Sequence, residues 1–307
     1  MSPTGEVRVD VEGRTLTISN LDKVLYPRTG TTKGEVLHYY AQVAPTLLPH
    51  LRDRAVTRIR WPHGTGGQSF FEKNVPAGTP SWVRTVTVPT TGSRAARAGS
   101  VGGGDTLVFP VVDDLATLTW LANLAALELH VHQWTVGRNG RPRNADRLVI
   151  DLDPGEPAGL HECCGVALEV RERLAARGLA ARPVTSGSKG LHLYADLPRR
   201  LPSEDSTALA REVAEELQRD LPQQVTATMT KAKRPGKVFL DWSQNAGSKT
   251  TIAPYSLRGR EKPFVATPVS WDEVAAGAED PLGLEQFRLD QVLDRVERLG
   301  DLFAAPS

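Results

Sequence analysis

The stretch DRLVIDLDPG, residues 146–155, constrains the fold more than any other, because an apolar run in it ends in two charges. The run from Leu148 to Leu152 predicts a buried strand. Asp151 and Asp153 are two positions apart and therefore point to the same face of that strand. Like charges this close repel, and a divalent cation such as Mg²⁺ or Mn²⁺ between them removes the repulsion. The stretch therefore predicts a cation site; the alternative is that Asp153-Pro154-Gly155 is simply a turn at the strand exit.

A third carboxylate follows another apolar segment. Asp241 lies in KVFLDWSQN, residues 237–245, which predicts a strand. Three acids at strand ends could hold two cations, an arrangement that suits in-line displacement at phosphorus. The alternative for Asp241 is again a turn residue at the end of a strand.

A donor-rich turn follows the first pair of acids. In TSGSKGLHLY, residues 185–194, Ser186, Ser188 and Lys189 alternate with two glycines, and such turns present N–H groups and hydroxyls to phosphate. The turn lacks the spacing of a Walker A motif. His192 lies on the strand after it, as either a structural or a functional residue.

A basic segment comes just after Asp241. Residues 244–260 contain Lys249, Arg258 and Arg260, and the planar fork of arginine suits phosphate oxygens. The alternative is a solvated basic loop. Three acids and two basic, Ser/Gly-rich turns together indicate a site for a metal-bound polyphosphate, and hence nucleotidyl transfer.

The order of elements favours an α+β fold over a doubly wound sheet, because strands and helices mix without regular alternation. Thr32 and Glu35 are spaced as a capping box at the start of a helix. We expect a hairpin at 7–18, strands at 54–61, 82–88 and 127–136, a flexible loop at 90–105, helices at 114–129, 160–177 and 204–219, a strand–turn–strand at 181–197, and a mainly helical tail from about 270.

The composition does not decide the class of function, but it indicates the cellular compartment. The net charge of +1 neither demands nor excludes nucleic acid as a partner. The two cysteines, Cys163 and Cys164, are adjacent and form no disulfide framework, which fits a reducing compartment. No apolar run reaches the roughly 18 residues of a membrane span, and the N-terminus lacks a signal-peptide pattern. We therefore expect a cytoplasmic protein with no membrane partner.

These motifs together resemble the polymerase domain of bacterial DNA ligase D, in the archaeo-eukaryotic primase superfamily. The matching stretches run in family order from residue 20 to about 260: LDKVLYPRTGTTK, RWPHG, FFEK, ALELHVHQW, IDLDPGE, VTSGSKGLHLY, TMTKAKRPGKVFLDWSQN and GSKTTIAPYSLRGR. The resemblance implies an archaeo-eukaryotic-primase-like core with central mixed or antiparallel β-sheets flanked by helices. It implies one domain, 1–307, with a DNA 5′-phosphate-binding segment at about 1–50, a catalytic core at about 51–265 and a helical tail at about 266–307.

The resemblance also implies an activity. Members are primase-polymerases that add NTP or dNTP, often preferring ribonucleotides, to primer 3′ ends at short gaps or broken DNA ends, with two Mn²⁺ or Mg²⁺ ions. The implied partners are gapped or 3′-overhang DNA with a 5′-phosphate, a ligase and end-binding repair proteins, in the bacterial cytoplasm at the nucleoid.

Residue roles follow by motif position. Asp151, Asp153 and Asp241 match the metal-binding and catalytic triad. Lys23 and Lys33 match lysines that hold a 5′-phosphate, and a lysine at a helix N-terminus such as Lys33 is well placed for this. Residues that match the nucleotide site are Ser186, Ser188, Lys189, His192, His130, Gln244, Arg258, Phe70 and Phe71. Phe70 and Phe71 are adjacent on an expected strand, so only one can face a core while the other is available to stack on a base.

Two features depart from the family pattern. Ile59 stands where the family has a second basic residue, leaving Arg58 and Arg60. The loop at 90–105, with Arg94 and Arg97, is longer than in the ligase-linked domains, where this region helps bring two ends together.

Two other functions remain open at this level. A metal-dependent nuclease or phosphohydrolase could use the same acids with water as the nucleophile. A DNA-end-binding module could use them only structurally. The chain is either a stand-alone paralogue or one domain of a larger ligase.

Overall fold

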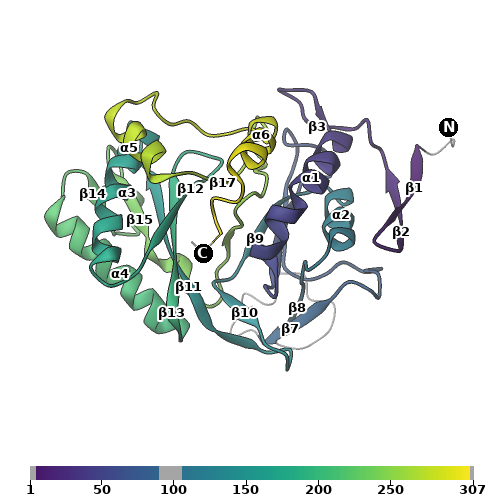
Figure 1. The fold of residues 1–307 in the computed structure, drawn as a ribbon, viewed down its shortest axis with the longest axis horizontal. Coiled ribbons are helices and arrows are strands. Elements are labelled where there is room, and N and C mark those ends of the chain that lie inside the picture. The colour runs from purple at the N-terminus through teal and green to yellow at the C-terminus, as the bar shows by residue number, and fades with distance from the viewer. Residues whose placement is uncertain (1–4, 90–105, 305–307) are drawn as a thin grey trace.

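A seven-stranded sheet carries the two aspartates of the first motif (Figure 1). The structure, a computed structural model, describes residues 5–89 and 106–304. Neighbouring strands of the seven-stranded sheet are antiparallel, except for the parallel β14–β15 pair. In spatial order they are β14 (Val225–Thr226), β15 (Val238–Asp241), β11 (Pro142–Pro154), β13 (Leu191–Leu201), β12 (Ala181–Thr185) and β17 (Thr267–Pro268), with β10 (Trp134–Val136) also beside β11.

A four-stranded sheet stands beside it. Its order is β16 (Thr251–Ile252), β9 (Ala126–Val131), β5 (Val56–Arg60) and β6 (Phe70–Glu72), so that β6 is an edge strand. The Tyr194 hydroxyl on β13 donates a 3.0 Å hydrogen bond to the Ile252 carbonyl on β16, which links the two sheets. Three two-stranded ribbons complete the β-structure: β1 (Glu6–Val11) with β2 (Arg14–Ser19), β3 (Val24–Tyr26) with β4 (Thr31–Thr32), and β7 (Thr85–Pro89) with β8 (Thr106–Pro110).

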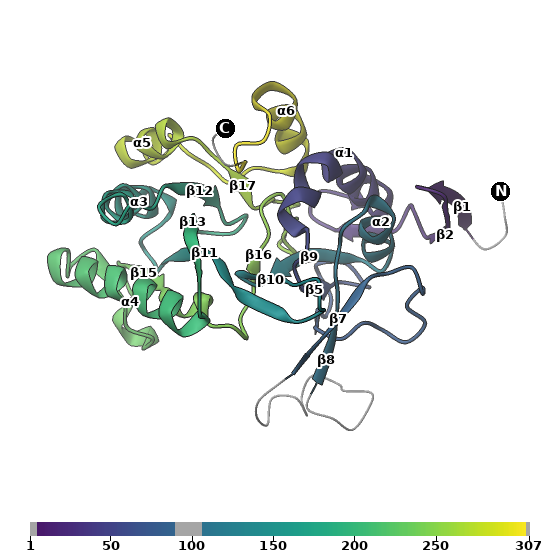
Figure 2. The same cartoon turned by 60° about the horizontal axis from the view of Figure 1, so that its bottom comes forward.

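Helices cover the outer sides of both sheets (Figure 2). One group lies on the side of the seven-stranded sheet and another on the side of the four-stranded sheet, while α6 lies near the C-terminus. Two short 3₁₀ helices, η2 (Lys231–Lys233) and η3 (Trp242–Asn245), flank β15. The α-helices are α3 (Leu160–Ala175), α4 (Ser203–Asp220) and α5 (Trp271–Glu279) on the first side, α1 (Lys33–Leu51) and α2 (Leu115–Asn123) on the second, and α6 (Leu289–Leu299). The expected α+β class is confirmed.

Successive side chains of β11 point to opposite faces of the sheet, and the two faces contact different cores. Leu148, Ile150 and Leu152 are fully buried in a core shared with α3 and α4. Burial of each such side chain contributes on the order of 2 kcal/mol before entropy costs. Val149, on the opposite face, belongs to the core that contains α1, α2 and the second sheet. Asp151 therefore points inward, between the two sheets.

The expected capping box is present at the start of α1. The Thr32 side chain accepts the N–H of Glu35, and the Glu35 carboxylate accepts the N–H of Thr32 at 2.7 Å. The main core draws residues from α1, from β9 and from α6, so the three segments expected at 1–50, 51–265 and 266–307 share one core.

Three elements differ from expectation. The single strand expected at 127–136 is two strands, β9 and β10, which belong to different sheets. The helix expected at 114–129 ends at Asn123, because Ala125 takes a left-handed φ of 58° and its carbonyl accepts the N–H of Trp61 at 2.9 Å. The chain then continues as β9 beside β5. The strand expected at 237–245 ends at Asp241, whose carboxylate accepts the N–H of Ser243 and begins η3. The loop expected at 90–105 lies outside the described residues.

Among the helices of residues 5–89 and 106–304, none is long and apolar enough to cross a membrane. Cys163 and Cys164 are both buried in α3 and are not disulfide-bonded to each other.

Candidate active site

Three strands bring the predicted acids into one row. In the antiparallel β11–β15 ladder Asp151 lies directly opposite Asp241, and in the β11–β13 ladder it lies opposite His192. Directly opposite residues in such ladders have Cβ atoms about 5 Å apart. Asp153 follows on the same face of β11. The expected convergence of Asp151, Asp153 and Asp241 in space is therefore present in the backbone.

The environment of the first two acids is strained electrostatically. Asp151 is 8% exposed, and its Oδ1 lies 3.2 Å from His192 Nε2 without forming a hydrogen bond to any described residue. Asp153 is open to solvent, but partial desolvation by the surrounding protein and the charge of Asp151 raise its pKa to about 6. Asp151 thus offers a buried oxygen without a hydrogen-bond donor among the described residues, and the nearby charge of Asp153 repels it. Both features suit a divalent cation between the two carboxylates.

Asp241 is held by its own turn. Its Oδ1 accepts the Ser243 N–H at 3.0 Å, its Oδ2 accepts the Gln244 side-chain amide at 2.9 Å, and Lys249 Nζ lies 4.0 Å from the same Oδ2. Within the described ranges no group of three or more His, Cys, Asp or Glu side chains is gathered as metal ligands. A metal bound by all three acids would therefore need the Asp241 side chain to turn toward Asp151 and Asp153.

The donor-rich turn between β12 and β13 packs against the end of β11. Ser186 Oγ accepts the N–H groups of Ser188 and Gly190 at 3.2 and 3.1 Å. Gly187 has a φ of 65°, and a Cβ there would lie 2.5 Å from Cγ of Arg258. The turn thus requires glycine and places Arg258 beside it. Lys189 is exposed and pairs with Glu156 at 2.7 Å.

A buried acid fixes the opposite wall. Glu128 on β9 is 4% exposed and accepts hydrogen bonds from His130 Nε2 at 2.7 Å and from the Gly259 N–H at 2.9 Å. Arg258 Nε lies 3.5 Å from the same carboxylate. Burial alone would raise the pKa of Glu128, but the His130 hydrogen bond and the Arg258 charge hold it at about 2. Sequence reasoning missed Glu128; the signal was an acid two positions before His130 in an apolar strand.

Most of the predicted site residues line one cleft of about 450 Å³. Arg234, which sequence reasoning did not single out, also lines it, with its guanidinium 3.6 Å from the centre of the Phe239 ring. Asp241 adjoins the cleft without lining it. The predicted residues in the lining are His130, Asp151, Asp153, Ser186, Ser188, Lys189, His192, Gln244, Arg258 and Arg260.

Phe70 and Phe71 lie apart from the cleft lining, on the edge strand β6. They are 40% and 59% exposed. Neither ring is therefore buried in a core.

The two predicted lysines are close together but differ in burial. Lys23 is exposed, whereas Lys33 is 4% exposed and its Nζ donates to the Ser19 carbonyl and to Asn123 Oδ1 at 2.5 and 2.6 Å. Burial and the neighbouring charge of Lys23 lower the pKa of the Lys33 ammonium to about 8. Lys33 is thus already partnered, and Lys23 is the more accessible cation.

Ile59 stands where the family pattern has a basic residue, and the arginines on either side of it are both paired. Ile59 packs against the main core, while Arg58 and Arg60 both pair with Glu72, at 2.6 and 2.9 Å. Arg58 is fully buried, so within the described residues only Arg60 of this pair keeps partial exposure.

Comparison with known proteins identifies close relatives. A family model described as LigD, primase-polymerase domain, matches residues 32–303. The chain is 47% identical to the multifunctional non-homologous end joining protein LigD of Mycolicibacterium smegmatis, over 94% of this chain and 35% of that protein. It is 34% identical to the bifunctional non-homologous end joining protein LigD of Bacillus subtilis, over 93% of this chain and 43% of that protein. The chain thus spans about a third of the length of its mycobacterial relative.

A solved structure matches over nearly the whole chain. The polymerase domain from Mycobacterium tuberculosis ligase D in complex with DNA superposes with a TM-score of 0.84 at 48% identity, covering 94% of this chain and 96% of that one. This match confirms the fold that the motifs implied.

Proposed function

The chain belongs to the LigD primase-polymerase domain family, and on that premise we propose that it extends primer 3′ ends on DNA during repair. The single observation that carries this proposal is the row Asp241–Asp151–His192. Asp151 and His192 share one cleft with a phosphate-type turn and Arg258, and Asp241 adjoins that cleft. A nucleotidyltransferase needs both parts together, because charge develops at the reacting phosphorus and on the leaving pyrophosphate.

The acids suit Mn²⁺ or Mg²⁺ by their chemistry. Both ions prefer carboxylate oxygens, and Asp151 offers a buried oxygen without a hydrogen-bond donor among the described residues. Asp151, Asp153 and Asp241 would hold two such ions, with the Asp241 carboxylate turned toward the other two. When bound, the ions would lower the pKa of the primer hydroxyl and neutralise charge on the triphosphate.

The other residues of the cleft hold and orient the nucleotide. Lys189 and Arg258 would bind phosphate oxygens, and the turn at Ser186 to Gly190 would add N–H donors. Glu128 keeps Arg258 and His130 in place. His192, close to Asp151 Oδ1, keeps that carboxylate oriented.

The finer parts of the proposal rest on the family resemblance. We infer a preference for ribonucleotides, and action at short gaps or ends whose 5′-phosphate binds near Lys23 and Lys33. The exposed rings of Phe70 and Phe71 are available to stack on bases. A ligase and end-binding repair proteins would act with the chain at the nucleoid.

Primer extension tests the activity. Labelled gapped DNA is incubated with Mn²⁺ and each nucleotide type, using the chain, its Asp151→Asn variant and a control, Asp205→Asn, whose side chain is exposed on α4. The chain and the control should lengthen the primer, faster with ribonucleotides, and Asp151→Asn should be slower by about 10³-fold or more. Shortened products would instead show a nuclease, and metal-independent binding without turnover would show an end-binding module.

A further inference from the structure

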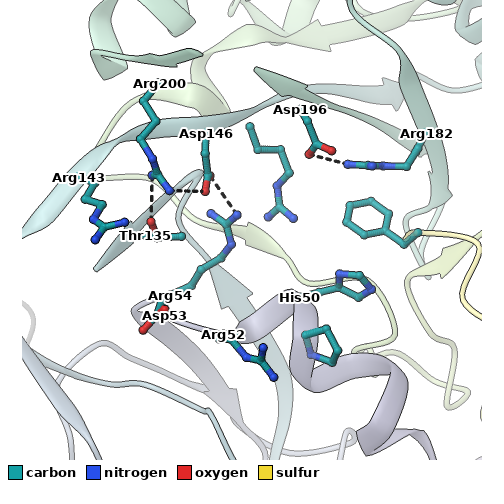
Figure 3. A pocket seen from close by; sticks show the side chains of 13 residues that line it. His50, Arg52, Asp53, Arg54, Thr135, Arg143, Asp146, Arg182, Asp196 and Arg200 are labelled. Carbon is teal, nitrogen blue, oxygen red and sulfur yellow. Dashed lines mark hydrogen bonds and ion pairs between the residues drawn. The ribbon is translucent and has the colours of Figure 1, made fainter. Parts of the chain in front are cut away.

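A second cavity, of about 330 Å³, lies at the end of α1 beside the first residues of β11 (Figure 3). It shares no lining residue with the aspartate cleft, that is, the cleft that Asp151 and Asp153 line. Its wall is unusually basic. The six arginines that line it are Arg52, Arg54, Arg143, Arg147, Arg182 and Arg200.

The cavity occupies the far end of the same strand face as the acids. Arg147 and Asp151 share one face of β11 and are four residues, or about 13 Å, apart. Asp196 lies opposite Arg147 on β13, just as His192 lies opposite Asp151. Between these two rows stands Tyr194, whose ring packs against Arg147 and whose hydroxyl lies 3.3 Å from His192 Nδ1. The two sites are therefore distinct but connected through one side chain.

The carboxylates in the wall do not balance the arginines. Asp146 is shared by Arg54 and Arg200, at 3.0 and 3.3 Å, and Asp196 pairs with Arg182 at 2.6 Å, as Figure 3 shows. The third aspartate of the wall, Asp53, pairs at 2.6 Å with Arg84, which does not line the cavity.

Three arginines therefore keep an excess of positive charge. Within residues 5–89 and 106–304, Arg52, Arg143 and Arg147 form no ion pair with a carboxylate, and the charges of Asp146 and Asp196 act on Arg147 only from a longer distance. Excess charge in a concave wall attracts an anion.

Arg147 shows most clearly that an acceptor is missing. It is the deepest of the six, 3% exposed, with its guanidinium 4.8 Å from the Tyr194 ring centre and 5.6 Å from that of Phe303. Its Nε donates to Gln133 at 2.9 Å, but its Nη2 has no hydrogen bond to any described residue. Burial and the nearby charge of Arg54 lower its pKa to about 9, and a buried guanidinium with an unmet donor is costly.

We propose that this cavity binds a phosphate-type oxyanion, supplied either by a small polyphosphate or by the DNA backbone. Guanidinium groups approach from the end of α1, from β11, from β12 and from β13, so the occupant must accept hydrogen bonds in several directions. A tetrahedral phosphate does this, whereas a planar carboxylate satisfies one fork. The volume accommodates a group the size of pyrophosphate.

Calorimetric titration of the whole chain with pyrophosphate, without divalent metal, tests the site. The pocket variant is Arg143→Gln/Arg200→Gln, and the matched control is Arg219→Gln/Arg298→Gln, which removes the same charge from exposed helix positions. The Lys189→Gln variant identifies binding in the aspartate cleft separately. The pocket variant should lose one class of binding by at least about tenfold, while the control and Lys189→Gln retain it. Equal titrations for pocket variant and control would overturn the proposal.

A second measurement identifies the source of the phosphate. Affinity for duplex DNA without a 5′-phosphate is measured against salt for the same variants. If DNA supplies the group, the salt slope of the pocket variant falls by up to about 2 relative to the control. If the slopes agree while pyrophosphate binding is lost, the ligand is a small polyphosphate. Should the double variant unfold, Arg143→Gln alone decides, because Arg143 is exposed and forms no ion pair in the described part of the chain.

Discussion

Asp241 lies directly across the β11–β15 ladder from Asp151, although the two residues are 90 positions apart in the chain. This pairing places Asp241 next to the cleft that Asp151 lines. The β11–β13 ladder adds His192 on the other side of Asp151. The proposed chemistry depends on this row, and the predictions below test it and its surroundings.

Removing one of the crowded acids should stabilise the metal-free chain. Asp153→Asn relieves the repulsion with Asp151, so in EDTA the midpoint of thermal unfolding should rise by about 1–3 °C. Adding Mn²⁺ should then stabilise the unsubstituted chain more than the variant. The control Asp294→Asn, at an exposed position in the middle of α6, should change neither value. A variant that is less stable in EDTA, or that gains equally from Mn²⁺, would contradict the cation site.

Glu128 should act as a positioning residue for the nucleotide. In Glu128→Gln the charge that orients Arg258 and His130 is lost while the shape of the side chain is kept. The KM for the nucleotide should rise about tenfold, and kcat should change less. Steady-state extension kinetics measure both.

The control for this variant is Glu273→Gln, which removes the ion pair between Glu273 on α5 and Arg295 on α6. It should lower thermal stability without changing the KM. A purely structural role for Glu128 predicts that both variants behave alike.

The lowered pKa of Glu128 predicts how the stability of the chain depends on pH. The pKa of Glu128 is depressed from 4.5 to about 2 in the folded chain, so its stabilising contribution is present above pH 4.5 and is lost as pH falls toward 2. The difference in unfolding free energy between the chain and Glu128→Gln should therefore be roughly 1.4 kcal/mol smaller at pH 3.5 than at pH 6. Urea unfolding at the two pH values measures it, and a constant difference would show that Glu128 is not held as an anion.

Lys23 should provide discrimination for the 5′-phosphate. It is exposed, whereas Lys33 already donates to Ser19 and Asn123. Lys23→Gln should weaken binding to gapped DNA with a 5′-phosphate by roughly fivefold and leave binding to the unphosphorylated gap nearly unchanged. Fluorescence anisotropy on the two DNAs provides the comparison. An equal loss on both would remove the phosphate role from Lys23.

Much of this architecture could be predicted from local patterns. The capping box at Thr32 and Glu35 and the strand–turn–strand around Ser186 depend on a few adjacent residues, and both are present. Family motifs placed Asp241 near Asp151, which spacing along the chain alone could not do.

Other features depend on contacts that no local pattern encodes. The helix expected at 114–129 ends early because Ala125 is fixed by Trp61, which is distant in sequence. Lys33 is buried by the packing of β2 and α2 around it. The arginine cavity gathers side chains from α1's end, β11, β12 and β13, and becomes visible only once these are folded together.

The most direct test of the central claim is a crystal of the chain with Mn²⁺ and a non-hydrolysable nucleotide, measured at a wavelength where manganese scatters anomalously. The account predicts anomalous peaks between Asp151 and Asp153, with a carboxylate oxygen of Asp241 turned to ligate one of them. Clear density for the nucleotide with no manganese peak among these three side chains would contradict it.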